Sequence, residues 1–411
     1  MMKKLMPLAV LGMVLAFAGS AVAAVDDGVP LVPNNLNPDD TTDNCESCTV
    51  QAPVEVSCET DACGKTEEAP SVAFRRNILP VQTVLNFSAA RVYTGFLVDA
   101  AGNIAGSIDV TFAKTNSRMM KTTFKATLMY GTKKDTATGW LDGKGVATVS
   151  SSPSTMTMTL DENTIAGTYG RYTFAGVLNI FRTKPSSLAE SRTVRMLLEQ
   201  WRKNVYTLVW KEGTSWIGGS AQVSSKGYLK VAGWRSVVKD DKTKVNTKSF
   251  SLKGYLVHVN DRSLVTLVST REDFARAMNL WRKGSEYTLE GVADGKVGVV
   301  GPLAKKSGAK IDNSLYQAEC DEQLAQGKIT TVPTIKMDDN GKWVCEPADA
   351  AKKLGMGFSF NSKSGRFQGK FRQSYTNDKK TAKMFGHVVN GVGYGFVAGY
   401  VSAPTPVTIG E

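Results

Sequence analysis

From about residue 78 onward the chain consists of short runs in which apolar and polar residues alternate, and turn signals containing Gly recur every eight to twelve residues. In residues 92–112, for example, two alternating runs flank the turn at Asp99–Gly102. Alternation is typical of strands with one buried face, and short turns connect antiparallel neighbours. The spacing predicts a mainly β protein of antiparallel barrel-like or sandwich-like units rather than alternating β and α elements.

One element built around two Gly residues recurs four times. The copies are 102–106, 170–176, 227–233 and 365–369. The first Gly of each copy suits a turn position with positive φ. The second Gly, inside the strand, suits a bulge or a sharp bend of a strongly curved sheet. Any single copy could arise by chance in a chain with 38 Gly, but four copies favour a structural role.

Two segments show helical instead of strand periodicity. The first covers about 187–203 and opens with Ser187 and Glu190 at the spacing of a capping box, and the second covers about 271–283. In each segment the apolar residues recur on one face of a helix. The sequence therefore predicts two short amphipathic helices inserted between strands.

The two predicted helices end alike, which indicates an internal duplication. Each ends in Trp-Arg-Lys, at Trp201 and Trp281, and each is followed by a strand that begins Tyr-Thr-Leu. The preceding strands, 172–178 and 250–256, also share a pattern that ends in Gly-x-Leu. We interpret both Trp residues as core anchors of a repeated strand–helix–strand unit. The alternative is a binding feature in which basic residues flank an aromatic ring.

These patterns divide the chain into six predicted parts. They are a signal peptide over 1–24, an acidic Cys-containing tail or linker over 25–77, a first β unit with a helix over 78–204, a second β unit with a helix over 205–302, a disulfide-containing insertion over 303–355 and a closing β meander over 356–411.

The N-terminal segment has the three parts of a secretory signal peptide. Lys3 and Lys4 form a basic region, an apolar stretch follows over 5–18, and small residues at 20–24 offer a cleavage site after Ala23 or Ala24. No later apolar run is long enough to span a bilayer, so we expect no transmembrane segment in the mature chain. The expected location is secreted, periplasmic or at the cell surface.

Six Cys residues, an even number, agree with an oxidising compartment. Cys320 and Cys345 stand apart from the rest and are predicted to form a structural disulfide. The other four, all in the acidic tail, allow three pairings that the sequence leaves open: Cys45, Cys48, Cys58 and Cys63. A four-Cys zinc site in this tail is the alternative, although its spacing and the secretory context favour disulfides.

Charge is divided unevenly along the chain. The formal net charge is +12, yet residues 25–70 carry eleven acids and one base, whereas residues 71–411 carry 47 bases and 27 acids, a net +20. A body this basic can attract an acidic polysaccharide or another polyanion, and nothing indicates specific nucleic-acid recognition. Two alternatives are a merely well-hydrated surface and an acidic tail that folds back on the basic body.

Motifs of known catalytic chemistry are absent from the sequence. The chain has two His, His258 and His387, and it lacks a phosphate-binding loop, a nucleophile elbow and a His-Glu-x-x-His motif. We therefore assign no catalytic residue, no cofactor and no metal site, and we interpret the chain as a secreted, non-enzymatic β-barrel protein with a structural, surface or binding role. The alternatives are a carbohydrate-active enzyme with paired carboxylates and a basic module that binds polyanions or glycans. The oligomeric state stays open.

The C-terminal segment resembles a known kind of module. The runs Gly-Met-Gly-Phe-Ser-Phe at 355–360, Gly-Arg-Phe-Gln-Gly-Lys-Phe at 365–371 and Gly-Val-Gly-Tyr-Gly-Phe at 391–396 are similar to Gly-rich β-repeat modules of uncharacterised secreted bacterial proteins. The resemblance covers about the last 55 residues well and the hairpin at 93–112 weakly. It implies a β-barrel-like module and export, and it carries no activity and no functional residue.

Overall fold

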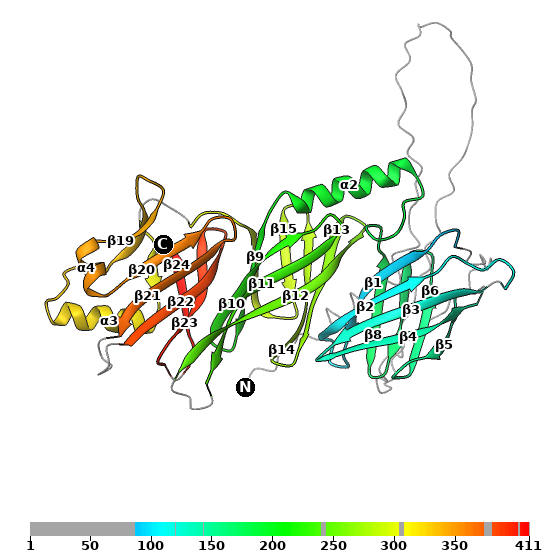
Figure 1. Cartoon of the computed structure of the whole chain (residues 1–411), viewed down its shortest axis with the longest axis horizontal. Coiled ribbons are helices and arrows are strands. Elements are labelled where there is room, and N and C mark those ends of the chain that lie inside the picture. The colour runs from blue at the N-terminus through cyan, green and yellow to red at the C-terminus, as the bar shows by residue number, and fades with distance from the viewer. Residues whose placement is uncertain are drawn as a thin grey trace, which may run out of the picture. The chain divides into compact units, whose positions relative to one another are not determined.

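Antiparallel strands account for most of the structure, as the sequence predicts (Figure 1). The computed structural model describes residues 87–119, 121–142, 144–239, 244–303, 308–373, 380–401 and 403–410. The predicted signal peptide, the acidic tail and its four Cys residues lie outside the described residues. All described residues belong to one compact unit.

The first eight strands form an up-and-down meander that nearly closes into a barrel. They are β1 (Arg91–Val98), β2 (Ile104–Phe112), β3 (Thr122–Tyr130), β4 (Lys133–Leu141), β5 (Ala147–Ser151), β6 (Met156–Leu160), β7 (Thr164–Tyr169) and β8 (Tyr172–Leu178). Strand β1 pairs with β8, and a bridge between Val146 and Thr159 connects the β5 and β6 sides. Aromatic and aliphatic side chains such as Tyr93, Phe112 and Phe124 fill the interior.

The next eight strands repeat this arrangement. They are β9 (Tyr206–Glu212), β10 (Ser215–Val223), β11 (Tyr228–Val238), β12 (Val245–Val259), β13 (Arg262–Arg271), β14 (Phe274–Lys283), β15 (Glu286–Glu290) and β16 (Ala293–Val299). Consecutive strands from β9 to β15 pair, and β16 returns to pair with β9. The interior is packed with buried residues that include Trp210, Phe250 and Phe274.

The last eight strands surround a third core. They are β17 (Lys310–Asp312), β18 (Thr334–Met337), β19 (Trp343–Glu346), β20 (Gly357–Asn361), β21 (Arg366–Gln373), β22 (Lys380–Val389), β23 (Val392–Ala398) and β24 (Thr405–Gly410). Six of them form one sheet in which β17 pairs with β24. The hairpin of β18 and β19 lies between the sheet edges, because Ala309 bridges to Ile335 and Trp343 contacts Phe358 and Phe360. The predicted insertion and the predicted closing meander thus both contribute strands to this third barrel-like unit.

Three helices connect strands within the described ranges: α2 (Leu188–Arg202), α3 (Ser314–Ala325) and α4 (Ala348–Lys353). The first predicted helix is confirmed as α2, and its N-cap Ser187 accepts a hydrogen bond from the Glu190 amide, as a capping box requires. Its Trp201 packs into the core of the β9–β16 barrel. Not every apolar residue of the predicted face is buried, because Leu188 is 80% exposed.

The prediction of a second helix over about 271–283 is wrong, because residues 274–283 form strand β14. Phe274, Met278 and Trp281 mimic helical spacing because both faces of this strand are buried. Met278 points into the core of the β9–β16 barrel, whereas Trp281 packs with residues of the first barrel such as Phe96. The duplicated strand–helix–strand unit is therefore also wrong, and the repetition in the structure is that of eight-stranded meanders.

The recurring Gly residues behave largely as predicted. The first Gly of every copy has positive φ, between 54° and 81°: Gly102, Gly170, Gly227 and Gly365. At the second position, a Cβ atom on Gly233 would clash with the carbonyl oxygen of Gly218 on the neighbouring strand. A β-bulge lies at Ala105, directly before Gly106, where the register between β1 and β2 shifts. These Gly residues let neighbouring strands approach closely in a strongly curved sheet.

The second and third barrels pack through their outer faces. Trp216 stacks near Tyr394, with 4.8 Å between ring centroids, and Trp234 contacts Phe385 at 5.3 Å. The hydroxyl of Thr207 donates a hydrogen bond of 2.6 Å to the carbonyl oxygen of Val388. These contacts position a turn of the third barrel beside strands β10 and β11.

Candidate functional site

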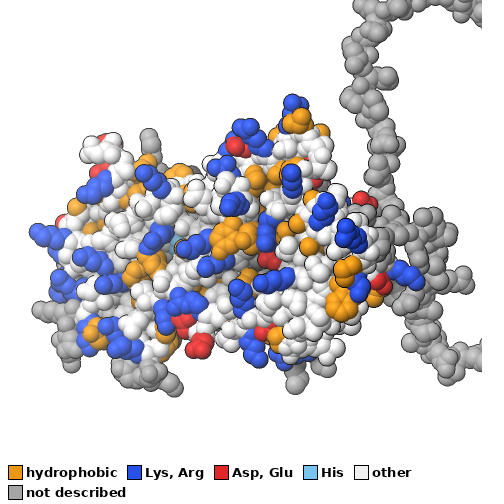
Figure 2. All heavy atoms as spheres, turned by 45° about the vertical axis from the view of Figure 1, so that its right-hand side comes forward, with side chains coloured by type: hydrophobic (Ala, Val, Ile, Leu, Met, Phe, Trp, Pro, Cys, Tyr) orange, Lys and Arg blue, Asp and Glu red, His pale blue; other side chains and the backbone are white. Residues whose placement is uncertain are grey.

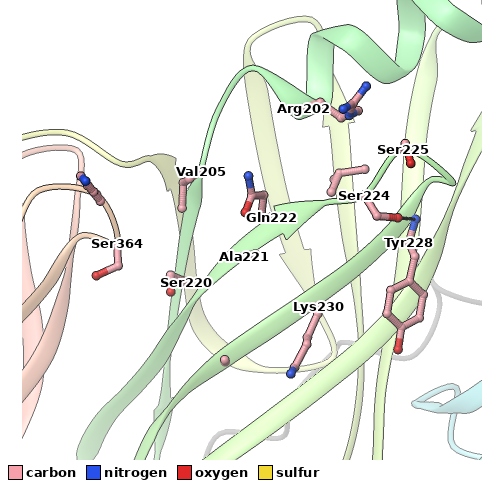
Figure 3. Close-up of a pocket in the computed structure, with 13 residues that line it drawn as sticks. Arg202, Val205, Ser220, Ala221, Gln222, Ser224, Ser225, Tyr228, Lys230 and Ser364 are labelled. Carbon is pink, nitrogen blue, oxygen red and sulfur yellow. Dashed lines mark hydrogen bonds between the residues drawn. The ribbon is translucent and has the colours of Figure 1, made fainter.

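A groove of about 720 Å³ follows the outer face of β10 and β11 (Figure 3). Its floor carries Ser220 and Gln222 from β10 and Lys230 from β11. These side chains point outward because they alternate with buried residues of the barrel core, as in any strand with one solvated face. The pairing register places Gln222 directly opposite Lys230, so polar groups from both strands share one surface.

Two walls bound this floor. One is the C-terminal end of α2, where Arg202 lies in the last turn of the helix. The other is the turn between β20 and β21, which contributes Lys363 and Ser364. Asn361 fixes this turn, because its side-chain oxygen accepts hydrogen bonds from the amides of both residues at 3.0 and 3.1 Å.

The tight turn between β10 and β11 fixes the remaining end of the groove. The Ser224 hydroxyl accepts a hydrogen bond of 3.1 Å from the amide of Tyr228 (Figure 3). The ring of Tyr228 packs at a tilt against that of Tyr255, with 5.1 Å between centroids, and is half-buried. The groove therefore has one aromatic side chain in its lining, held in place from two sides.

The lining is positively charged. It contains Arg202, Lys230 and Lys363 and neither Asp nor Glu. Lys230 and Lys363 form no ion pair with any residue that the structure describes. On the face drawn in Figure 2, Lys and Arg side chains likewise outnumber Asp and Glu. Cationic groups beside hydroxyl and amide groups can bind an anion that also carries hydroxyl groups.

The predicted core anchors lie away from this groove. Trp201 is 1% exposed and contacts Tyr206 and Tyr287 at one end of the second barrel. Trp281 is 6% exposed, and its ring nitrogen donates a hydrogen bond of 2.7 Å to Glu290. Both rings are thus buried, although they belong to a helix and a strand that are not equivalent.

The predicted disulfide is not formed in the structure. Cys320, which is buried in α3, and Cys345, which is half-buried in β19, are both free thiols. Burial raises the pKa of each thiol to about 11, which disfavours the reactive thiolate. Both belong to the third unit, where α3 and the β18–β19 hairpin pack on its core. The disulfide stays a prediction.

The carboxylates of the described residues do not converge on the groove. Asp135, near one end of the first barrel, accepts hydrogen bonds from the hydroxyls of Tyr130 and Tyr169, the latter at 2.6 Å. These bonds hold the pKa of Asp135 below its usual range, so the group stays charged. In the part of the chain that the structure describes, no three His, Cys, Asp or Glu side chains gather as a metal site would require.

Comparison with protein-family models finds no match, and comparison with curated proteins finds no relative. Among the described residues, every helix is too short or too polar to cross a bilayer.

The groove could not be located from the sequence, because its lining comes from three distant segments around residues 202, 220–232 and 363. A partial signal was available. Ser220, Gln222 and Lys230 follow the outer face of two strands that flank a Gly turn, so a polar surface on this hairpin could be predicted. The contribution of the β20–β21 turn depends on how the barrels pack, and local patterns carry no information about that.

Proposed function

We propose that this protein is a non-enzymatic binding protein that holds an acidic polysaccharide along the groove on β10 and β11. The observation that carries the proposal is the lining itself, with three cationic side chains and no carboxylate. Hydroxyl and amide groups of Ser220 and Gln222 lie among these cations and suit the hydroxyl groups of a sugar. The net charge of +20 over residues 71–411 would attract such a polymer from a distance.

A polysaccharide fits the groove better than a single-stranded nucleic acid. Nucleic-acid grooves combine positive charge with several aromatic side chains on which successive bases stack. Here Tyr228 is the one aromatic side chain in the lining, and its ring is engaged with Tyr255. A polymer of charged sugars requires ion pairs and hydrogen bonds, which the lining supplies.

Binding of an oligogalacturonate, a chain of uronic acids, tests the proposal. Affinity should fall at least about tenfold between roughly 50 and 200 mM salt, because exposed charges are screened. Replacing both groove lysines, Lys230→Gln with Lys363→Gln, should weaken binding about five- to thirtyfold, since each exposed ion pair contributes up to about 1 kcal/mol. Isothermal titration calorimetry measures both effects.

The matched control removes two lysines from the exposed face of the first barrel, Lys125→Gln with Lys134→Gln. It makes the same change in net charge, so equal weakening by both pairs would indicate general attraction without a groove site. An affinity that responds neither to salt nor to either pair would contradict the proposal. Release of shorter sugars from the oligogalacturonate would favour a carbohydrate-active enzyme instead.

We also infer that residues 1–24 direct export, which would place the binding protein at the cell surface, in the periplasm or outside the cell. The support is the basic, apolar and small-residue order of this segment. The resemblance of the C-terminal residues to modules of secreted bacterial proteins points the same way. Mass spectrometry of exported protein should find a new N-terminus near Val25, and an intact Met1 in that fraction would contradict the inference.

In an oxidising compartment we expect Cys320 and Cys345 to form a disulfide. The bond would close a loop of 25 residues, from α3 to β19, and stabilise the fold by about 3 kcal/mol. Peptide mapping of the exported protein without reductant should recover the two Cys residues in one linked fragment. Two alkylatable thiols in the native exported protein would refute this expectation.

A further inference from the structure

Near the groove, the side chain of Arg366 lies over an aromatic ring of the neighbouring barrel. The guanidinium carbon of Arg366 lies 3.3 Å from the ring centroid of Trp234. Trp234 follows Ala232 by two residues on the outer face of β11, and Arg366 follows Ser364 by two residues, and both Ala232 and Ser364 line the groove. Trp234 and Arg366 are not themselves among the lining residues, but each lies two residues along the chain from one, so the pair is next to the groove.

The charge of Arg366 is not balanced locally. Among the residues that the structure describes, none accepts a hydrogen bond from its guanidinium or forms an ion pair with it. The side chain is half-buried, and this burial lowers its pKa from the usual value, although an Arg stays charged at any physiological pH. A partly desolvated cation without a counterion is costly, and a bound anion would remove that cost.

His387 lies directly opposite Arg366 in the β21–β22 pairing. It is 1% exposed, both of its ring nitrogens lack a hydrogen-bond partner, and its ring centroid is 6.3 Å from that of Trp234. Burial first, and the charge of Arg366 second, lower the pKa of His387 to about 3, so the ring is neutral at physiological pH. The neighbour of Arg366 on β22 is therefore an uncharged, buried and polar side chain.

Stacking also fixes how Arg366 can bind. A guanidinium that lies flat on an indole has its face occupied, while the N–H groups at its edge still point outward in one plane. Such a fork matches the two oxygens of a planar carboxylate through paired hydrogen bonds. Lys230 and Lys363, by contrast, are flexible point charges that attract any anion.

We propose that Arg366, held on Trp234, is the residue beside the groove that pairs with the carboxylate of a uronic acid unit. This inference rests on the proposed function, because it names the sugar class bound at the same site. Arg366 donates two hydrogen bonds to one uronate carboxylate, while the two lysines hold neighbouring acidic units.

The test compares two probes of equal length, an oligogalacturonate and a dextran sulfate oligomer, with wild type and with Arg366→Lys. The substitution keeps the positive charge and removes the planar fork. We expect it to weaken oligogalacturonate binding about tenfold or more, because the paired hydrogen bonds to a carboxylate are lost. An unchanged affinity for oligogalacturonate beside a weakened affinity for dextran sulfate would place a sulfate group at Arg366 and would overturn the inference. The pair Lys230→Gln with Lys363→Gln should weaken both probes. Thermal unfolding of each variant checks the fold.

A footprint on the wild-type protein needs no substitution. Phenylglyoxal modifies accessible Arg side chains, and mass spectrometry locates the modified residues. Oligogalacturonate should slow the modification of Arg366 at least about fivefold, while the rate of modification of the exposed Arg192 of α2 stays unchanged. Two results would overturn this inference: equal oligogalacturonate affinity of Arg366→Lys and wild type, or modification of Arg366 that the sugar does not slow. If the double Lys variant still binds weakly, the proposed function is unaffected. Absence of binding of both probes to wild type would overturn the inference together with the proposed function.

Discussion

His387 illustrates how burial sets the chemistry of a single residue in this protein. Its folded pKa of about 3 lies below the value near 6.5 of an unfolded His. As the pH falls below 6.5, His387 therefore becomes protonated in the unfolded chain but stays neutral in the folded protein. The stability that depends on neutral His387 is complete above pH 6.5 and is lost as the pH falls toward 3.

We expect His387→Phe to reduce the loss of stability in acid. Between about pH 6 and pH 4, the wild type should lose up to about 1.4 kcal/mol per pH unit through this group. Urea denaturation at several pH values measures the free energy of unfolding of wild type and variant. The difference between the two free energies cancels the contributions of the carboxylates, which both proteins share. A difference that stays constant from pH 7 to pH 4 would mean that His387 is not held neutral.

Trp201 is the residue on which the attachment of α2 depends. Its ring is 1% exposed and contacts two Tyr rings of the second barrel, whereas Met196 on the same helix is 61% exposed. Trp201→Ala should lower the free energy of unfolding by about 3–5 kcal/mol, because it leaves a cavity. Met196→Ala should change it by less than about 0.5 kcal/mol. Chemical denaturation that finds equal effects would contradict this assignment.

Among the elements, those with explicit local signals could be predicted. The sequence predicts α2 near its observed bounds from the Ser187 cap and the spacing of its apolar residues, and it predicts the hairpin of β1 and β2 from the alternation in residues 92–112. Strand β14 was mistaken for a helix, since it contacts the second barrel core on one face and the first barrel on the other. Its alternation is lost for that reason, and its Ala, Met, Leu and Arg residues favour a helix.

The close approach of strands at paired Gly residues is a second feature of the elements. Each barrel has one directly opposed Gly pair: Gly95 with Gly176, Gly219 with Gly233, and Gly386 with Gly395. The positions of single Gly residues were visible in the sequence, but their pairing depends on strand register. These pairs occur where a side chain would separate neighbouring strands.

Gly233→Ala tests this role. The added Cβ would clash with the carbonyl oxygen of Gly218, so we expect a loss of about 1–3 kcal/mol in the free energy of unfolding. Gly301→Ala is the control, because its Cβ would approach Val299 no closer than 3.9 Å and the substitution stiffens the unfolded chain. Similar midpoints of thermal unfolding for the two variants would contradict the steric account.

At the scale of the whole molecule, two eight-stranded meanders are followed along the chain by a third unit with a six-stranded sheet and a hairpin, and the proposed site arises where the second and third units pack. Fold class followed from alternation and turn spacing, since these are local properties. The position of the groove did not follow from local patterns, because Arg202, the β10–β11 hairpin and Lys363 come together only where the outer faces of the second and third barrels pack. The charge of residues 71–411 indicated a class of partner but not a place for it.

Hydrogen–deuterium exchange with and without oligogalacturonate can locate a bound polymer along the whole chain. If the polymer occupies the groove, exchange slows in two segments, the β10–β11 hairpin over 220–232 and the turn over 361–366, and stays unchanged in strands β3 and β4 of the first barrel. Protection confined to other parts of the chain, or no protection at a saturating concentration of the sugar, would contradict binding in the groove.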